Sequence, residues 1–221
     1  MKVYKLTDYN NQTRNNTQWG EGVTHTASGE GELCSRGWLH AYTDPRLAVI
    51  LNPIHTNFSN PRLWEAEAGG EFKHDKQLKM GCTKLTTTRE IPLPKISSDV
   101  KTEFAIRCAL KVYQEGSFVV WANKWLSGED RTGAAAEAAA EAAWAARAAR
   151  VAWAAEAAWA VAQAAARAAE ATWAATRAAR AARAATWAAR AARAATWAAW
   201  AAARVADIDL IQILNEMGVK S

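Results

Sequence analysis

The sequence has few cysteines and no long uncharged apolar run. Its three cysteines are an odd number without a Cys-x-x-Cys pair, which favours free thiols in a reducing compartment over a disulfide framework. The N-terminal residues contain no apolar segment typical of a signal peptide, and no run of about 18 apolar residues is free of charge. We therefore expect a cytoplasmic protein that does not enter the membrane.

Signatures of metal sites, phosphate loops and activated nucleophiles are also missing. The four histidines show no short paired spacing of the zinc type, and the glycines of residues 20–32 alternate with glutamates whose charge opposes a phosphate. No Gly-x-Ser-x-Gly occurs, and Cys34 is expected to be a small buried apolar residue in preference to a partner of His40. The sequence predicts neither a metal nor a cofactor.

Glycine and proline are absent from residues 134–206, where 45 of the 73 residues are alanine. Alanine, arginine and glutamate favour helix, so this stretch is predicted to be helical. It also holds seven of the twelve tryptophans, which are too apolar to leave in water. Trp159, Trp173 and Trp187 repeat every 14 residues, a period that favours left-handed supercoiling. The stretch is therefore expected to fold back on itself or to pair with other chains.

Charge is ordered along this stretch. Glu137 and Glu141 precede the first arginine, whereas residues 177–204 contain no acid. The order suits the helix dipole and also suits antiparallel pairing of helices. The stretch has nine arginines and four glutamates, which accounts for the +5 net charge of the chain. We predict an antiparallel bundle, either within one chain or between chains of a homo-oligomer.

Arginine next to tryptophan is also suited to holding phosphates and stacking on bases. The alternative is that arginine keeps an alanine helix soluble while tryptophan packs a core, and this alternative is favoured over nucleic-acid binding. If the stretch binds a ligand, the candidate residues are Trp159, Trp173, Trp187, Trp197, Arg177, Arg180, Arg183, Arg190 and Arg193.

The first 96 residues show the two-residue alternation typical of strands. Strands are predicted at residues 2–6 and 62–68, and a closing pair of strands at residues 78–85 and 86–93. A short helix is expected to begin at Asp44-Pro45 and to stop at Asn52-Pro53.

From Ser97 the period becomes helical. Helices are predicted from Ser97 or Ser98 to Tyr113 and from Ser117 to Leu126. A last apolar helix is expected after Asp207 or Asp209, ending at Gly218, either as a lid on the bundle or as a self-association helix. The predicted fold class is α+β, with four parts: a strand-rich domain (1–96), two connecting helices (97–128), an alanine-rich helical region (129–206) and a capping helix (207–221).

The first 96 residues resemble an uncharacterised family of phage and bacterial proteins. The shared features are Gln18-Trp19-x-x-Gly22, Leu33-Cys34-x-x-Gly37-x-Leu39-His40, Asp44-Pro45 and Trp64-Glu65-Ala66-Glu67. Phage relatives look similar in carrying long alanine-rich tails. The resemblance implies no activity, and in a phage setting it places the protein in the host cytoplasm.

The same residues resemble, more weakly, the ADP-ribosyltransferase fold of small rifampin-modifying enzymes. Residues 41–45 and 64–69 take the places of that family's Tyr-x-Thr-like segment and Val-Glu-x-x-Gly strand. The family holds its dinucleotide with a His or Arg on the first strand, and residues 3–7 have neither; His25 and His40 are the nearby substitutes. The resemblance implies Tyr42, His40, Glu65 and Glu67 as site residues.

Three classes of function follow. The sequence favours a non-enzymatic binding protein, in which a small α+β domain stands on a self-associating Trp/Arg/Ala scaffold and docks on a host protein or sequesters an anionic, nucleotide-like ligand. The first alternative is an ADP-ribosyltransferase-like enzyme, including a degenerate one. The second is nucleic-acid binding through the Arg/Trp helix.

Overall fold

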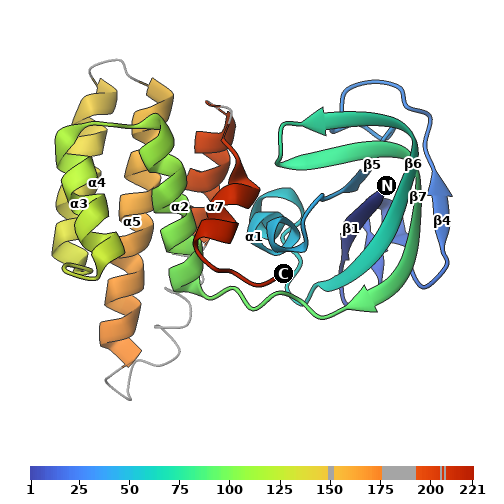
Figure 1. The fold of residues 1–221 in the computed structure, drawn as a ribbon, viewed down its shortest axis with the longest axis horizontal. Helices are drawn as coiled ribbons and strands as arrows, with labels where there is room; N and C mark the ends of the chain where they lie inside the picture. Colours follow the sequence, from blue (N-terminus) through green and yellow to red (C-terminus); the bar gives the residue numbers. More distant parts are fainter. Residues whose placement is uncertain (149–151, 176–192, 205, 207) are drawn as a thin grey trace. The chain divides into compact units, whose positions relative to one another are not determined.

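The computed structural model describes residues 1–148, 152–175, 193–204, 206 and 208–221. The chain forms two compact units, one made of Met1–Ile96 with Leu214–Ser221 and one made of Ser97–Ile213 (Figure 1). The first unit is built on an antiparallel sheet and the second on helices, which confirms the predicted α+β class.

The sheet of the first unit is centred on a long hairpin, β6 (Arg62–Asp75) and β7 (Lys79–Ile91). The predicted pair of strands at 78–85 and 86–93 is wrong, because these residues form the single strand β7 and their partner is β6. Two register shifts between β6 and β7 mark bulges, which bend a strand without ending it. The sequence pattern changes phase at a bulge, and this change looks like a strand boundary.

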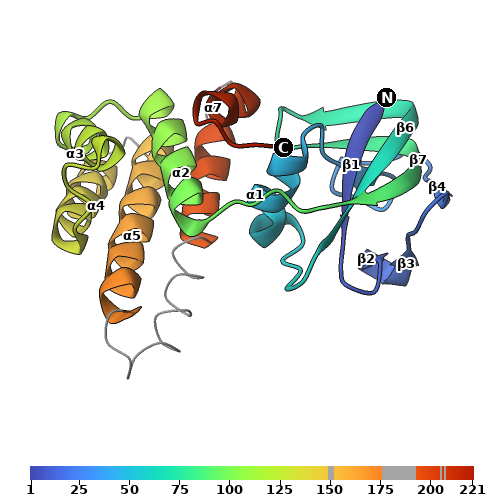
Figure 2. The same ribbon diagram turned by 60° about the horizontal axis from the view of Figure 1, so that its bottom comes forward.

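The shorter strands complete a closed ring. β1 (Lys2–Thr7) pairs with β6, while β4 (Thr24–Thr26) and β5 (Leu39–Ala41) pair with β7. The ring closes where Tyr4 and Tyr42 exchange two backbone hydrogen bonds, with N–O distances of 2.8 and 2.9 Å. A small separate hairpin, β2 (Gln12–Thr13) and β3 (Thr17–Gln18), follows β1 (Figure 2). The curled sheet therefore encloses its own core.

That core is made mainly of small and aliphatic side chains. Its buried members are Val3, Trp19, Ala41, Ala66, Ala68, Met80, Cys82 and Leu85. The alternation predicted for residues 62–68 is present, since the alanines at 66 and 68 are buried while Glu67 is exposed. Leu63 is also buried although it lies on the opposite face, and α1 packs against the neighbouring strand β1. Both faces of β1 and β6 are thus partly covered.

Helix α1 (Pro45–His55) begins as predicted, with the Asp44 carboxylate accepting a hydrogen bond from the Arg46 amide at 2.8 Å. The expected stop at Asn52-Pro53 is wrong, because the helix runs through Pro53 to His55. A proline removes one backbone donor from a helix. Here Leu47, Ile50 and Leu51 are fully buried, and this packing holds the helix for three residues beyond Asn52. The extension places His55 beside the sheet.

The second unit contains the predicted helices. α2 (Ser98–Val112) is capped by the Ser97 hydroxyl, and α3 (Gly116–Ser127) buries Phe118, Trp121 and Trp125. These bounds agree with the prediction to within one residue at each end.

The alanine-rich stretch folds back within the chain. α4 (Gly133–Ala148) and α5 (Ala152–Ala175) lie side by side, α5 also contacts α2, and residues 193–204 form another helix (Figures 1 and 2). A Cβ placed on Gly133 would lie 3.7 Å from the Ala166 carbonyl oxygen, so small residues let the backbones of α4 and α5 approach closely. Within the described residues, no helix has the length and apolar character needed to span a bilayer.

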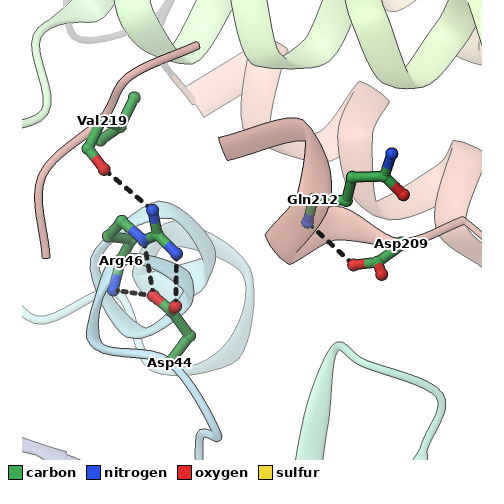
Figure 3. Close-up of polar contacts among 5 residues, drawn as sticks. All are labelled: Asp44, Arg46, Asp209, Gln212 and Val219. Carbon is green, nitrogen blue, oxygen red and sulfur yellow. Dashed lines mark hydrogen bonds and ion pairs between the residues drawn. The ribbon is translucent and has the colours of Figure 1, made fainter. Parts of the chain in front are cut away.

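The last helix, α7 (Leu210–Glu216), is capped by Asp209, which accepts from the Gln212 amide at 2.9 Å (Figure 3). The predicted stop residue Gly218 follows the helix, and its φ is +68°. The Gly218 amide bonds to the Asn215 carbonyl and the Val219 amide to the Leu214 carbonyl, which is a Schellman motif. Residues 214–221 group with the first 96 residues, and the Val219 carbonyl accepts from Arg46 at 2.8 Å.

Candidate functional site

The two glutamates suggested by the transferase resemblance lie on strand β6. The Glu65 carboxylate accepts from Arg89 and from Lys2, each at 2.7 Å, and these two bonds lower its pKa to about 2. Glu65 is opposite Tyr4, which in turn is opposite Tyr42, so one strand separates Glu65 from Tyr42. Glu67 is exposed on the same strand. The Glu65 carboxylate is therefore already held by two cations.

Tyr42 forms a close pair with His55 at the end of α1. The Tyr42 hydroxyl lies 3.0 Å from His55 Nδ1, and the two rings stack with centroids 5.8 Å apart. Burial raises the pKa of Tyr42, so its hydroxyl stays protonated. Burial is also the main cause that lowers the pKa of His55 to about 4, with smaller contributions from Lys79 and His40. Both side chains are thus neutral at pH 7.

His40 and Lys79 complete what we call the His–Lys cluster, defined as His40, Tyr42, His55 and Lys79. His40 Nε2 bonds to the Leu33 carbonyl oxygen, which can only accept, so Nε2 carries the proton. Burial lowers the pKa of His40, and Lys5 and Lys79 lower it further. Lys79 Nζ lies 3.0 Å from Cys34 Sγ. Cys34 is exposed, which corrects the expectation that it is buried.

The loop around Cys34 explains its exposure. The Gly29 amide bonds to the Gly37 carbonyl, and Trp38 Nε1 donates to the Gly31 carbonyl at 3.1 Å. These contacts close the loop on itself and bury Leu33, which leaves Cys34 on the outside above Lys79. The buried cysteines are Cys82 and Cys108.

The His–Lys cluster is unusual in its charge. His40, His55 and Lys79 are all partly exposed, and among the described residues no Asp or Glu forms an ion pair with any of them. Nor is any group of three or more His, Cys, Asp or Glu side chains arranged to hold a metal ion in the parts of the chain that are described. The cluster offers hydrogen-bond donors and positive charge, and the acid opposite Lys79 in the strand register is Asp75 of β6.

A second lysine, Lys5, is buried nearby on β1. Its Nζ donates to the His40 carbonyl oxygen at 2.8 Å and lies 4.8 Å from the centroid of the Trp19 ring. Burial lowers its pKa to about 8. Lys5 occupies the first strand, where the transferase family has a His or Arg, but its ammonium bonds to the backbone of β5.

The residues predicted to bind a ligand in the alanine-rich stretch are only partly described. Trp159 is half-buried on α5, Trp173 is on the same helix, and helix 193–204 carries Arg193 and Trp197, both exposed. The other five lie outside the described residues: Trp187, Arg177, Arg180, Arg183 and Arg190.

Residues 1–99 match the profile of a family described as a domain of unknown function (DUF7666). The match covers the part of the chain where the resemblance to an uncharacterised family was expected. No curated protein and no solved structure matches the chain.

Sequence reasoning found His40 and Tyr42 but missed His55 and Lys79. The expected helix stop at Pro53 left His55 outside the predicted helix, so it was not considered as a site residue. A helix that begins at Asp44 and continues through Pro53 would have included it. Lys79 starts a strand and has no local signature. The pairing of β5 with β7 brings Lys79 near His40, and local periodicity does not report this pairing.

Proposed function

We propose that the first unit is a non-enzymatic binding domain for a small ligand bearing an oxyanion, with a phosphate monoester of the nucleotide type as the preferred chemistry. The observation that supports this best is Lys79, whose ammonium contacts the Cys34 sulfur, lowers the pKa of both His40 and His55, and forms no ion pair with an Asp or Glu of the described residues. A cation in such a place is satisfied by an external anion, and charge-assisted hydrogen bonds to phosphate are among the strongest in proteins.

The two imidazoles offer different groups to such a ligand. His40 holds its proton on Nε2, so its Nδ1 accepts a hydrogen bond when the ring is neutral. In the tautomer in which Tyr42 donates to His55 Nδ1, the His55 Nε2–H is left to donate. Together with Lys79 the cluster presents two donors and one acceptor. A phosphate monoester that keeps one proton matches this set, whereas a carboxylate has no hydroxyl for His40.

The cluster supports binding more than turnover. An ADP-ribosyltransferase needs a carboxylate near the reacting bond, and here Glu65 is engaged by Lys2 and Arg89. Asp75 is opposite Lys79 in the strand register, but no described acid forms an ion pair with the cluster. The transferase alternative therefore lacks a supporting contact. Turnover of NAD in the test described next would favour that alternative over a binding domain.

The test is a thermal-shift and calorimetry panel on the full chain with AMP, ADP, cyclic nucleotides, NAD, inorganic phosphate and acetate. We expect the phosphate monoesters to bind best, and Lys79→Gln to weaken binding about tenfold to a hundredfold through loss of one charge-assisted bond. Lys84→Gln, an exposed lysine of the same strand, is the matched control and keeps full affinity. Equal affinity in Lys79→Gln, or no binding of any oxyanion, refutes the proposal.

The pH dependence gives an independent check. A bound anion favours protonated His55, whose pKa is lowered to about 4 in the free domain, while neutral His40 accepts the proton that the phosphate monoester keeps. Binding must then take up protons, and affinity must rise as the pH falls from 7.5 to 5.5. Calorimetry in buffers of different ionisation enthalpy measures this uptake.

Self-association of the alanine-rich region and docking on a host protein remain proposals from the sequence. Sedimentation of the full chain at increasing concentration tests the first. A monomer at all concentrations removes it.

A further inference from the structure

Helix 193–204 has its small residues on one side and its large residues on the other. The side chains at Ala195, Ala198, Ala199, Ala202 and Ala203 are buried, with at most 2 % exposed. The large residues follow spacings of four, three and four, which places them along one side of a helix. We call this row the Arg–Trp stripe: Arg193, Trp197, Trp200 and Arg204. The buried side of this helix consists of alanines, so its packing does not depend on the large side chains of the stripe.

The stripe presents an aromatic surface between cations. The Trp197 and Trp200 rings meet edge to face with centroids 5.1 Å apart and planes at 79°, and the Arg204 guanidinium carbon lies 5.3 Å from the Trp200 centroid. Trp197 remains 44 % exposed despite these contacts, and Arg193 is exposed one turn before it. Exposure of one apolar side chain alone is ordinary on a protein surface, but here the exposed indole is flanked by a second indole and by arginines on the same side of the helix.

The positive charge of the surrounding sequence indicates a negatively charged partner. Residues 171–206 contain six arginines and no aspartate or glutamate. Arg193 and Arg204 are eleven residues apart, which is roughly 16 Å along a helix. A polyanion with exposed planar groups complements such a row, because arginine binds phosphate and an exposed indole stacks on a base. Duplex DNA keeps its bases stacked inside the helix and offers no free face to Trp197.

We propose that the Arg–Trp stripe binds single-stranded nucleic acid, with Arg193 on the phosphate backbone and a base stacked on the exposed face of Trp197. The proposal is independent of the oxyanion site in the first unit, because it uses a different element and a different chemistry. It reverses the preference drawn from composition alone, which treated these arginines and tryptophans as solubilising and core residues.

The experiment measures the fluorescence anisotropy of labelled 12-nucleotide single-stranded DNA and RNA against the full chain at 50 mM salt. We expect Trp197→Ala to weaken binding about tenfold to a hundredfold, as for loss of one stacked base, and Trp197→Phe to restore most of it. Arg193→Gln should lower the slope of log affinity against log salt by about one. Circular dichroism checks that each variant keeps its helices.

Two control variants make the outcome decisive. Val120→Ala removes another exposed apolar side chain from α3 and should leave binding unchanged. Lys79→Gln should also leave it unchanged, which separates this surface from the oxyanion site. The proposal is overturned if Trp197→Ala binds the oligonucleotide as tightly as the wild type, if duplex competes as well as single strand, or if Trp197→Ala only dissociates a dimer.

Discussion

Lys5 gives the sharpest test of the structure. Its ammonium is in the closed sheet, where 7 % of the residue is exposed, and burial lowers its pKa from 10.5 to about 8. A lowered lysine pKa means that the folded state binds the proton more weakly than the unfolded state does. The stability associated with neutral Lys5 is present above pH 10.5 and is lost as the pH falls through 8. The size of this effect is about 3 kcal/mol.

Lys5→Met keeps an unbranched side chain that is one heavy atom shorter, and it removes the charge. At pH 7 the gain of about 3 kcal/mol is offset by about 1 kcal/mol for the hydrogen bond lost at the His40 carbonyl oxygen, so the variant should be more stable by about 2 kcal/mol. Between pH 8 and 10.5 this advantage should shrink by about 3 kcal/mol and change sign.

Two measurements check the prediction. Carbon NMR of lysines labelled at Cε gives the titration of Lys5 directly, with Lys5→Met used to assign the signal. Denaturant unfolding at pH 7, 9 and 10.5, followed through the amide signals of β1 and β6, gives the stability difference. Lys84→Met controls for the loss of an exposed lysine. A Lys5 titration near 10.5, or a stability difference that does not change with pH, would show that the interior is not as dry as the structure indicates.

Three further predictions follow from the first unit. Because burial lowers the pKa of His55 from 6.5 to about 4, stability should fall by about 3 kcal/mol as the pH decreases between those values, and His55→Gln should remove that fall in acid unfolding curves. Asp44→Ala removes the cap of α1 and leaves the buried Arg46 guanidinium without its carboxylate, so denaturant unfolding should show a loss of about 3–5 kcal/mol, and Asp44→Asn a smaller one. Gly37→Ala should lower the melting temperature, because its Cβ would lie 2.0 Å from the Glu30 carbonyl oxygen, whereas Gly116→Ala, with nothing within 4 Å, should not.

The helical half shows which features short sequence motifs can predict. The sequence offered Ser97 or Ser98 and Asp207 or Asp209 as caps and Gly218 as a stop, and the structure has Ser97, Asp209 and Gly218 in these places. These features depend on residues no more than five apart. The same kind of signal failed at Pro53, where burial of the apolar face of α1 outweighed one missing hydrogen bond.

The strands show where the sequence pattern stops being sufficient. Alternation located β1 and the first half of β6, but the bulges changed its phase and one long strand was taken for two. Closure of the sheet at Tyr4 and Tyr42 has no local signature, because it joins residues 38 positions apart through two backbone bonds.

By itself, the sequence determined the α+β class, the change of period near Ser97 and the helicity of the alanine-rich stretch, since each follows from propensity and short-range spacing. Only the tertiary structure decided that this stretch folds back in one chain, that α1 brings His55 to Tyr42, and that β7 brings Lys79 beside His40. Those contacts depend on strand register and on which faces are buried together, and the free energy that selects them is a property of the packed chain.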